Sequence, residues 1–326
     1  MIAYILRRLL LLLPMAAGMI VVTFGLLLLI PGDPAAVLLG PEATPDQIAA
    51  LRDRLGLNEP WYVQLGLYFG NVAQGDLGMS IFQSQPVLTV ILDRLGATIE
   101  LAVAALVIAT IIGVTLGILA ATRQGSWIDT ACMLFAQLGV SMPVYWLGIL
   151  LMLLFAVTLG WLPSIGRGEP IVEAVGAALT GRPGVLVDSL AHLLMPAIAL
   201  GANSAAIISR LVRTAMLEVL REDFVRTAYS KGLRRGRVMM GHVFRNALMP
   251  VISIIGLRFG ILLGGAVLTE QIFGWPGLGQ LTITAISQRD LQLIQGVLLS
   301  FGLIFALVNL LVDLTYAAVD PRVRLG

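Results

Sequence analysis

The side chains that could do chemistry are few in this sequence and lie far apart. The two histidines, His192 and His242, are 50 positions apart, so they lack the spacing of metal ligands. Pairing Ser204 with His192 as a nucleophile and base is no better, because on one helix they would lie about 18 Å apart. The only lysine, Lys231, precedes Gly232, whereas a phosphate-binding GxxxxGK[ST] loop needs Ser or Thr there. We therefore expect no catalytic residue, no metal site and no bound cofactor in this chain.

The composition indicates an integral membrane protein. The 326 residues are 58% hydrophobic and only 12% charged, with a mean hydropathy of +0.93, whereas soluble domains carry about 25% charged residues. So much apolar surface is stable only against lipid. The formal net charge of +2 creates no overall basic field, so we expect no nucleic acid among the partners.

Six apolar stretches are long enough to cross about 30 Å of hydrocarbon. They must be helices, because lipid offers no hydrogen-bond partner to a bare backbone group. The fourth stretch is the most polar, with Asn203 and a potentially kinking Pro196, so we expect it to face other helices or a water-filled path. The predicted fold is an all-α integral membrane protein with six transmembrane helices. These cover residues 9–30, 98–119, 130–158, 192–212, 250–268 and 293–316.

The basic residues are concentrated on one side of these spans. Two precede the first span, one lies between the second and third, nine lie within 210–249 and two follow the sixth, which makes 14 of the 21 lysines and arginines. The positive-inside rule then predicts that both termini and a long loop, 213–249, are cytoplasmic. We divide the chain into residues 1–97, the first span with a helical region on the outer side, and 98–326, a five-helix transmembrane core carrying the cytoplasmic loop.

Residues 31–97 contain signals for small helices on the outer side. Thr44 and Gln47 have the spacing of a capping box, and Gly56 marks the end of that helix. An aromatic-rich amphipathic helix follows from Trp61. This second helix would lie along the membrane interface or dock an outside partner.

Helical periodicity predicts a short amphipathic helix within the cytoplasmic loop, over residues 223–232. A second one follows over 235–248, and Pro250 then opens the fifth span. Two interpretations fit this pattern equally well. The pair would lie on the membrane with its arginines on anionic lipid headgroups, or it would dock a cytoplasmic protein, with the small Ala228 and Gly232 permitting close approach.

The motifs of this loop resemble those of ATP-binding-cassette importer permeases. The stretch RTA-x3-G, followed by RNALMP, is similar to that family's cytoplasmic pattern Glu-Ala-Ala-x3-Gly with a later Leu-Pro. Arg226 and Thr227 replace the leading Glu-Ala, and Pro250 follows after a longer spacer than usual. Both departures resemble the dipeptide and oligopeptide branch of the family. The resemblance continues almost end to end through the stretches IPGDP, QGDLG, ATIEL, EQIFGWPGLG and VNLLVDLTYAAVDPRVR.

The resemblance implies one channel-forming half of a binding-protein-dependent importer for di- and oligopeptides in the bacterial inner membrane. A second homologous permease chain, cytoplasmic ATPase subunits holding ATP and Mg, and a periplasmic substrate-binding protein would complete it. Nickel chelates or glutathione are alternative substrates, and a gradient-driven secondary transporter is the rival class. Helix 223–232 would be the coupling helix that the ATPase moves. Its predicted contact residues are Glu222, Asp223, Phe224, Arg226, Thr227, Ala228, Lys231 and Gly232.

Arg258 is the main candidate for the translocation pathway. It lies about 12 Å along a helix counted from Pro250, near mid-bilayer. An arginine there costs at least about 2.5–3.5 kcal/mol, so it should face water or a partner. It would attract an anionic group such as a peptide carboxylate; the alternatives are an ion pair with Glu100 or a side chain that snorkels to the cytoplasm. Asn203 and Glu100 are weaker pathway candidates.

The stretch EQIFGWPGLG at 270–279 is rich in turn formers and would dip back near the outer mouth. Phe273, Trp275 and Pro276 are candidates for an outer gate. An aromatic anchor at the membrane interface is the alternative.

Overall fold

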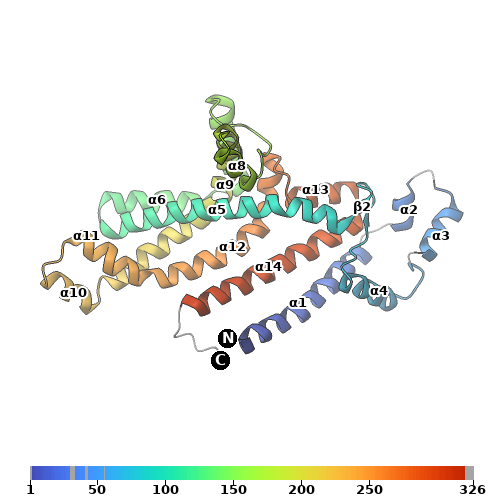
Figure 1. Ribbon diagram of the computed structural model, residues 1–326, viewed down its shortest axis with the longest axis horizontal. Helices are drawn as coiled ribbons and strands as arrows, with labels where there is room; N and C mark the ends of the chain where they lie inside the picture. The colour runs from blue at the N-terminus through green and yellow to red at the C-terminus, as the bar shows by residue number, and fades with distance from the viewer. Residues whose placement is uncertain (1, 30–33, 41–42, 55, 320–326) are drawn as a thin grey trace. The chain divides into compact units, whose positions relative to one another are not determined.

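The structure is a computed structural model that describes residues 2–29, 34–40, 43–54 and 56–319. Helices dominate it, as predicted, and the described residues include one short strand pair, β1 (Met79–Ser80) with β2 (Gln85–Pro86) (Figure 1). The two arginines after the sixth predicted span and most of the IPGDP motif lie outside these ranges.

Four of the described helices are long and apolar enough to cross a membrane, and a bent helix pair makes a fifth when it is taken as one span. In α1 (Ile2–Leu29) the apolar stretch Leu13–Gly25 is shorter than these membrane-crossing helices. The four are α5 (Val87–Thr122), α9 (Pro183–Val219), the continuous stretch Arg235–Phe273, and Leu291–Leu311 of α14 (Leu291–Val319).

The chain forms two compact units, Met1–Gly96 together with Gly277–Gly326, and Ala97–Pro276. In the first unit α1 packs against α14 and against α4 (Trp61–Ala73). The short helices α2 (Pro34–Leu39) and α3 (Pro45–Arg54) lie between α1 and α4 in the sequence. Helix α13 (Leu278–Gln288) precedes α14.

The predicted capping box at the start of α3 is confirmed. The Thr44 N–H donates to Oε1 of Gln47 at 3.0 Å, and the Gln47 N–H donates to the Thr44 hydroxyl at 3.4 Å. Gly56, just beyond the helix, has a left-handed backbone with φ +67°. These bonds satisfy donors that the first turn of a helix leaves free.

Asp290, which the sequence patterns did not single out, joins the strand pair to the start of α14. Its side chain is fully buried. One carboxylate oxygen accepts from the Ser80 hydroxyl at 2.7 Å and the Ile81 N–H at 2.9 Å, and the other accepts from the Leu293 N–H at 3.1 Å. Leu293 belongs to the apolar cluster of this unit, so the carboxylate fixes the hairpin against the core.

In the second unit the predicted third span, 130–158, is broken. α6 (Trp127–Ser141) and α7 (Val144–Leu151), which continues as the π-helix η1 (Met152–Thr158), meet at an angle of 107°. The break lies at Met142, whose backbone is extended (φ −83°, ψ 127°) because a residue before proline avoids the helical region. Pro143 lacks an N–H to continue the ladder. The predicted stretch therefore consists of two helices rather than one continuous helix.

α9 packs against α6, α7, α8 (Ile171–Leu179) and the helix that ends at Phe273. Its approach to α5 is close enough to exclude side chains at three glycines, Gly201, Gly113 and Gly117. A Cβ on Gly201 of α9 would lie 2.6 Å from the Ala105 carbonyl, and one on Gly113 of α5 would lie 2.6 Å from the Ala205 carbonyl. Small residues permit this backbone contact, as is usual between helices in membranes.

The last long helix of this unit begins earlier than predicted. α11 (Arg235–Arg237), the π-helix η2 (Val238–Phe244) and α12 (Arg245–Phe273) follow one another without a break. The predicted helix 235–248 is therefore continuous with the stretch predicted as the fifth span, and Pro250 lies inside α12 rather than at its start. In Figure 1 α10, at 223–230, and α11 lie at one end of the long helices of this unit, and α8 lies toward the other.

We predict that Asp290→Ala lowers the free energy of unfolding by about 2–4 kcal/mol, because it leaves a buried hydroxyl and two backbone N–H groups without an acceptor. Thermal unfolding of the detergent-solubilised chain would measure the loss. Ser287→Ala removes only a bond to the carbonyl of Ile283 on its own exposed helix face and should leave the midpoint unchanged. Equal midpoints for all three proteins would contradict the assignment.

Candidate functional site

The predicted amphipathic helix of the loop is present as α10 (Asp223–Ser230). Glu222 precedes it in an extended conformation, and Gly232 follows it with a left-handed backbone, φ +76°. Only glycine adopts that conformation without strain, so the turn after α10 depends on Gly232. Because α9 ends at Val219 and the next helix begins at Arg235, α10 is a short segment held between two long helices.

The inner face of α10 is anchored to its own chain. Val225 is 1% exposed and Ala228 is 8% exposed. They belong to an apolar cluster with Met216 near the end of α9 and with Met239 and Val243 of η2. The small side chain of Ala228 therefore allows α10 to approach its own core. Its predicted part in the close approach of a partner stays a prediction, and in the described chain the residue faces inward.

The opposite face of α10 is free. Asp223, Arg226, Thr227 and Ser230 are exposed, and Phe224 at the edge of this face is 43% exposed. Lys231 and Glu222, at the two ends, are exposed as well. Arg226 and Asp223 are 4.0 Å apart and almost fully solvent-accessible, so this ion pair adds little stability.

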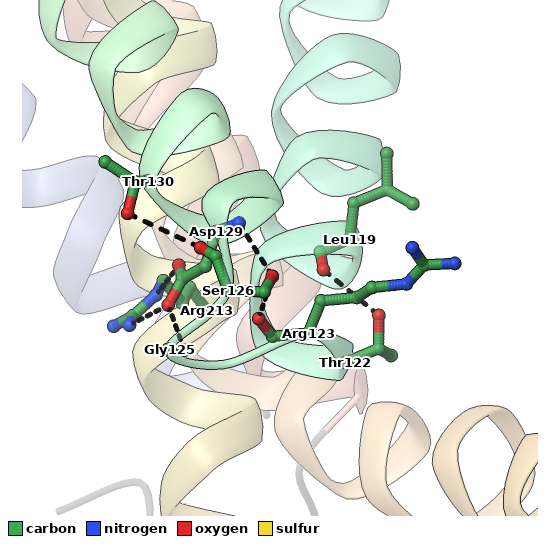
Figure 2. A network of polar contacts seen from close by, with 8 residues as sticks. All are labelled: Leu119, Thr122, Arg123, Gly125, Ser126, Asp129, Thr130 and Arg213. Carbon is green, nitrogen blue, oxygen red and sulfur yellow. Dashed lines mark hydrogen bonds and ion pairs between the residues drawn. The ribbon is translucent and has the colours of Figure 1, made fainter.

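Near the end of α9, an ion pair fixes the turn between α5 and α6 to that helix (Figure 2). The carboxylate of Asp129, 5% exposed, accepts from Nε and Nη2 of Arg213, both at 2.7 Å. The same carboxylate accepts from the Gly125 N–H at 3.0 Å, and the Ser126 hydroxyl caps α6 by accepting from the Asp129 N–H at 3.4 Å. Two parallel bonds fix the orientation of the guanidinium as well as its distance.

The sequence analysis did not identify this pair. The spacing Ser126-x-x-Asp129 before an apolar run is a helix-start signal that would have located the carboxylate. Its partner could not be read in the same way, because Arg213 is 84 positions away.

Arg258 lies on the inward stripe of α12. It is seven residues after Val251 and four before Leu262, both of which are buried, so at helical spacing it shares their face. The residue is half-buried, and its Nε is buried without a hydrogen-bond partner among the described residues. The alternative of an ion pair with Glu100 is not seen among the described residues, where the Glu100 carboxylate pairs with Arg167.

Glu100 belongs to a polar group around the turn after α12. Its carboxylate accepts from Nη2 of Arg167 at 2.5 Å and from the Ile171 N–H at 3.3 Å. The Arg167 guanidinium also lies over the ring of Trp275, 5.6 Å from its centroid, where the cation is attracted to the ring face. The segment 167–171 is thereby held against α5.

Trp275 and Phe273 are core residues, 0% and 2% exposed. The Trp275 indole N–H donates to the Ala97 carbonyl at 2.8 Å, and the Phe273 carbonyl accepts from the Gly166 N–H at 2.8 Å. The alternative of an aromatic anchor in the membrane interface is therefore wrong for these two rings. Their burial follows from the left-handed turn at Gly274, which directs the chain back over α5.

The third pathway candidate, Asn203, is half-buried on α9. A nearby cavity of about 290 Å³ between α5, α6, α7 and α9 is lined almost entirely by apolar side chains. Since binding sites for polar molecules need convergent polar groups, this cavity is a poor site for a peptide. No ion pair or hydrogen bond joins Asn203, Glu100 and Arg258 within the described ranges, and these ranges contain no cluster of His, Cys, Asp or Glu fit to hold a metal.

We predict that Ala228→Arg destabilises the chain on its own, without any partner, by about 3 kcal/mol or more, because it forces a charge into the apolar cluster beneath α10. Thermal unfolding in detergent is the measurement. Arg226→Ala, on the exposed face of the same helix, is the matched control and should unfold like the unaltered chain. A stable Ala228→Arg chain would show that α10 is not anchored through this residue.

Comparison with known proteins agrees with this architecture. The family profile described as "Binding-protein-dependent transport system inner membrane component" matches residues 113–325. A companion profile for the N-terminal part of such components matches residues 1–102. Among solved structures, the inward-facing MetNI methionine ABC transporter matches with a TM-score of 0.56 at 17% identity, over 71% of this chain and 96% of that one.

Full-length relatives are more similar. The dipeptide transport system permease protein DppB of Alkalihalophilus pseudofirmus is 47% identical over 99% of this chain and 100% of its own length. The di/tripeptide transport system permease protein DppB of Pseudomonas aeruginosa is 43% identical, and the dipeptide permease DppB of Escherichia coli is 42% identical, each over 99% of both chains. The chain therefore belongs to the family of binding-protein-dependent transport system inner membrane components, the ABC importer permeases that its motifs resemble.

Proposed function

We propose that this chain is one of two channel-forming permease subunits of an ABC importer for di- and oligopeptides in a bacterial inner membrane. The relatives named for dipeptide and di/tripeptide transport, matched over their whole length, support this substrate class. Six membrane-spanning helices with both termini in the cytoplasm are part of the proposal, as is a functional division into residues 1–97 and 98–326. The orientation follows from the excess of basic residues near 210–249.

The observation that carries the proposal is the two-sided character of α10. Its inner face is buried in its own chain, while its outer face is exposed and polar with Phe224 at the edge. A helix that only lay on lipid would turn its apolar face outward. We infer that α10 seats in a cytoplasmic ATPase subunit and transmits its motion through α9 and the 235–273 helix. The proposed contacts are Glu222, Asp223, Phe224, Arg226, Thr227, Lys231 and Gly232, with Ala228 serving as the anchor beneath them.

ATP and Mg would be bound by the ATPase partners, so this subunit performs no catalysis. A periplasmic binding protein would deliver the peptide to the outer mouth. The turn Phe273–Pro276, with the Phe273 and Trp275 rings buried and Pro276 half-buried, is fastened to α5 by the Trp275 indole. It would then form a wall of the outer gate. Arg167 and Glu100, which hold the segment 167–171 over this turn, would be the contacts that change when the mouth opens.

Arg258 would line the path between the two permease chains, with Asn203 nearby on α9. A half-buried guanidinium with an unsatisfied Nε in a membrane helix needs water or an anion. The C-terminal carboxylate of a peptide supplies such an anion, and two parallel hydrogen bonds to it suit the guanidinium geometry.

To test coupling, we would measure the ATPase activity of the whole assembly in lipid nanodiscs, with and without peptide-loaded binding protein. Phe224→Ala combined with Arg226→Ala should lower the stimulation by about tenfold or more, because exposed aromatic and arginine anchors commonly dominate an interface. The variant chain should still fold, since both side chains are exposed.

Phe135→Ala is the control, because Phe135 is a comparably exposed ring on α6, remote in sequence from α10. It should leave the stimulation unchanged. An assembly without a co-purifying ATPase, or stimulation that ignores the double variant, would refute α10 as the coupling helix.

For the pathway, Arg258→Gln should slow uptake of peptides with a free carboxylate by about tenfold relative to C-terminally amidated peptides, as expected for loss of one charged hydrogen-bond partner. Arg258→Lys should retain part of the preference. The two peptide classes would be compared as uptake into proteoliposomes with saturating binding protein. Unchanged uptake of both classes by Arg258→Gln would exclude this role.

A further inference from the structure

A recess of about 750 Å³ opens between the α5–α6 turn and the start of the 235–273 helix, within the second unit. The turn contributes Thr122, Arg123 and Gln124, and the helix contributes Arg235 and Met240. Two of the lining residues are arginines and none is acidic. The remaining floor is largely apolar, so the recess combines positive charge with an apolar surface.

The two arginines leave most of this charge uncompensated. Arg235 donates from Nη2 to the Thr122 carbonyl at 2.9 Å, which holds the two walls of the recess together. Arg123 is exposed, and its guanidinium makes no hydrogen bond or ion pair with any described residue. Figure 2 shows the Arg123 side chain extending away from the Asp129–Arg213 pair. A ligand with negative charge therefore meets two guanidinium groups and no carboxylate.

The recess lies where the apolar surface of the span ends. Residues 101–122 of α5 contain no charged side chain, and at 1.5 Å per residue they extend about 33 Å, enough to cross the hydrocarbon. Arg123 is the first charge after this run, and Trp127, four residues later, is 78% exposed. An exposed tryptophan beside such a boundary is typical of the headgroup level of a membrane. Met240, on the rim, is 50% exposed and extends the apolar surface toward lipid.

We propose that this recess binds the phosphodiester headgroup of an anionic phospholipid. Guanidinium groups are strong donors to phosphate, and the Gln124 amide at the rim offers a neutral donor beside them. The apolar floor suits the first methylenes of the acyl chains. A nucleotide fits less well, because the lining holds no aromatic ring on which a base could stack.

Binding there would bridge two segments that matter for coupling. The α5–α6 turn is fixed to α9 by the Asp129–Arg213 pair, and the helix starting at Arg235 follows α10 after a short linker. A headgroup held by Arg123 and Arg235 would brace the base of α10 from both sides. The assignment to the cytoplasmic leaflet rests on the proposed function, but the lipid site itself does not.

The test is native mass spectrometry of the complete assembly released from nanodiscs of phosphatidylcholine with a minor share of phosphatidylglycerol. The unaltered chain should retain phosphatidylglycerol. Arg123→Gln should lower retention about fivefold, as expected for one basic residue at a membrane surface, and Arg123→Gln with Arg235→Gln should lower it further. Arg237→Gln is the matched control, because Arg237 is exposed in the same helical turn as Arg235 but does not line the recess.

Retention that is equal in Arg123→Gln and the unaltered chain, or that falls equally in Arg237→Gln, would overturn the proposal. Loss of the lipid on adding millimolar glycerol 3-phosphate would assign the recess to soluble phosphates instead. The permease pair alone could retain phosphatidylglycerol and lose it when the ATPase subunits bind. That result would show that a protein occupies the recess in the assembly. None of these results depends on ATPase activity, so a failure of the importer proposal would be seen separately.

Discussion

Lipid supplies no hydrogen-bond partner to a peptide group, and the way this chain interrupts its helices follows from that constraint. At the bend between α6 and α7, the Met142 N–H still reaches the Leu138 carbonyl at 3.0 Å. At the end of α12 the left-handed Gly274 returns the Trp275 N–H to the Glu270 carbonyl at 2.9 Å. The Glu270 side chain there is fully buried and accepts from the Thr98 hydroxyl at 2.7 Å. Helices stop where the protein itself can satisfy the groups that are released.

The charged side chains are likewise satisfied by partners within the protein. Asp129 with Arg213 and Glu100 with Arg167 are each paired, and each pair joins two segments distant in sequence. Because desolvation offsets much of the attraction in such pairs, they are better understood as devices that position segments than as sources of stability. Arg258 is different, since a buried part of its guanidinium group has no partner in the described chain. An unpaired cation is costly in a membrane, and that cost is the physical reason to connect it with transported anions.

The anchoring of α10 bears directly on the proposed transmission of motion from a partner to the membrane helices. A helix attached to the rest of the chain only by flexible linkers could move without moving the spans. Here Val225 and Ala228 are packed with residues of α9 and η2, and the α5–α6 turn is fixed to α9 two turns before that helix ends. Force applied to the outer face of α10 would therefore reach α5, α6, α9 and α12 together. Rigid packing of this kind transmits displacement because cores resist compression.

The sequence by itself determined the membrane character, the helical fold, the position of α10 and the family, since hydropathy, helical period and local motifs are properties of neighbouring residues. It also located the α3 capping box, whose partners are three positions apart. It did not determine the bend at Met142, the burial of Trp275 or the inward direction of Ala228, although Pro143 and Gly274 were visible as local signals. Only the tertiary structure decided these, together with the pairing of Asp129 with Arg213 and of Asp290 with Ser80, because the groups that meet are 84 and 210 positions apart. Which face of a helix turns inward depends on the surface that it meets, and no local pattern carries that information.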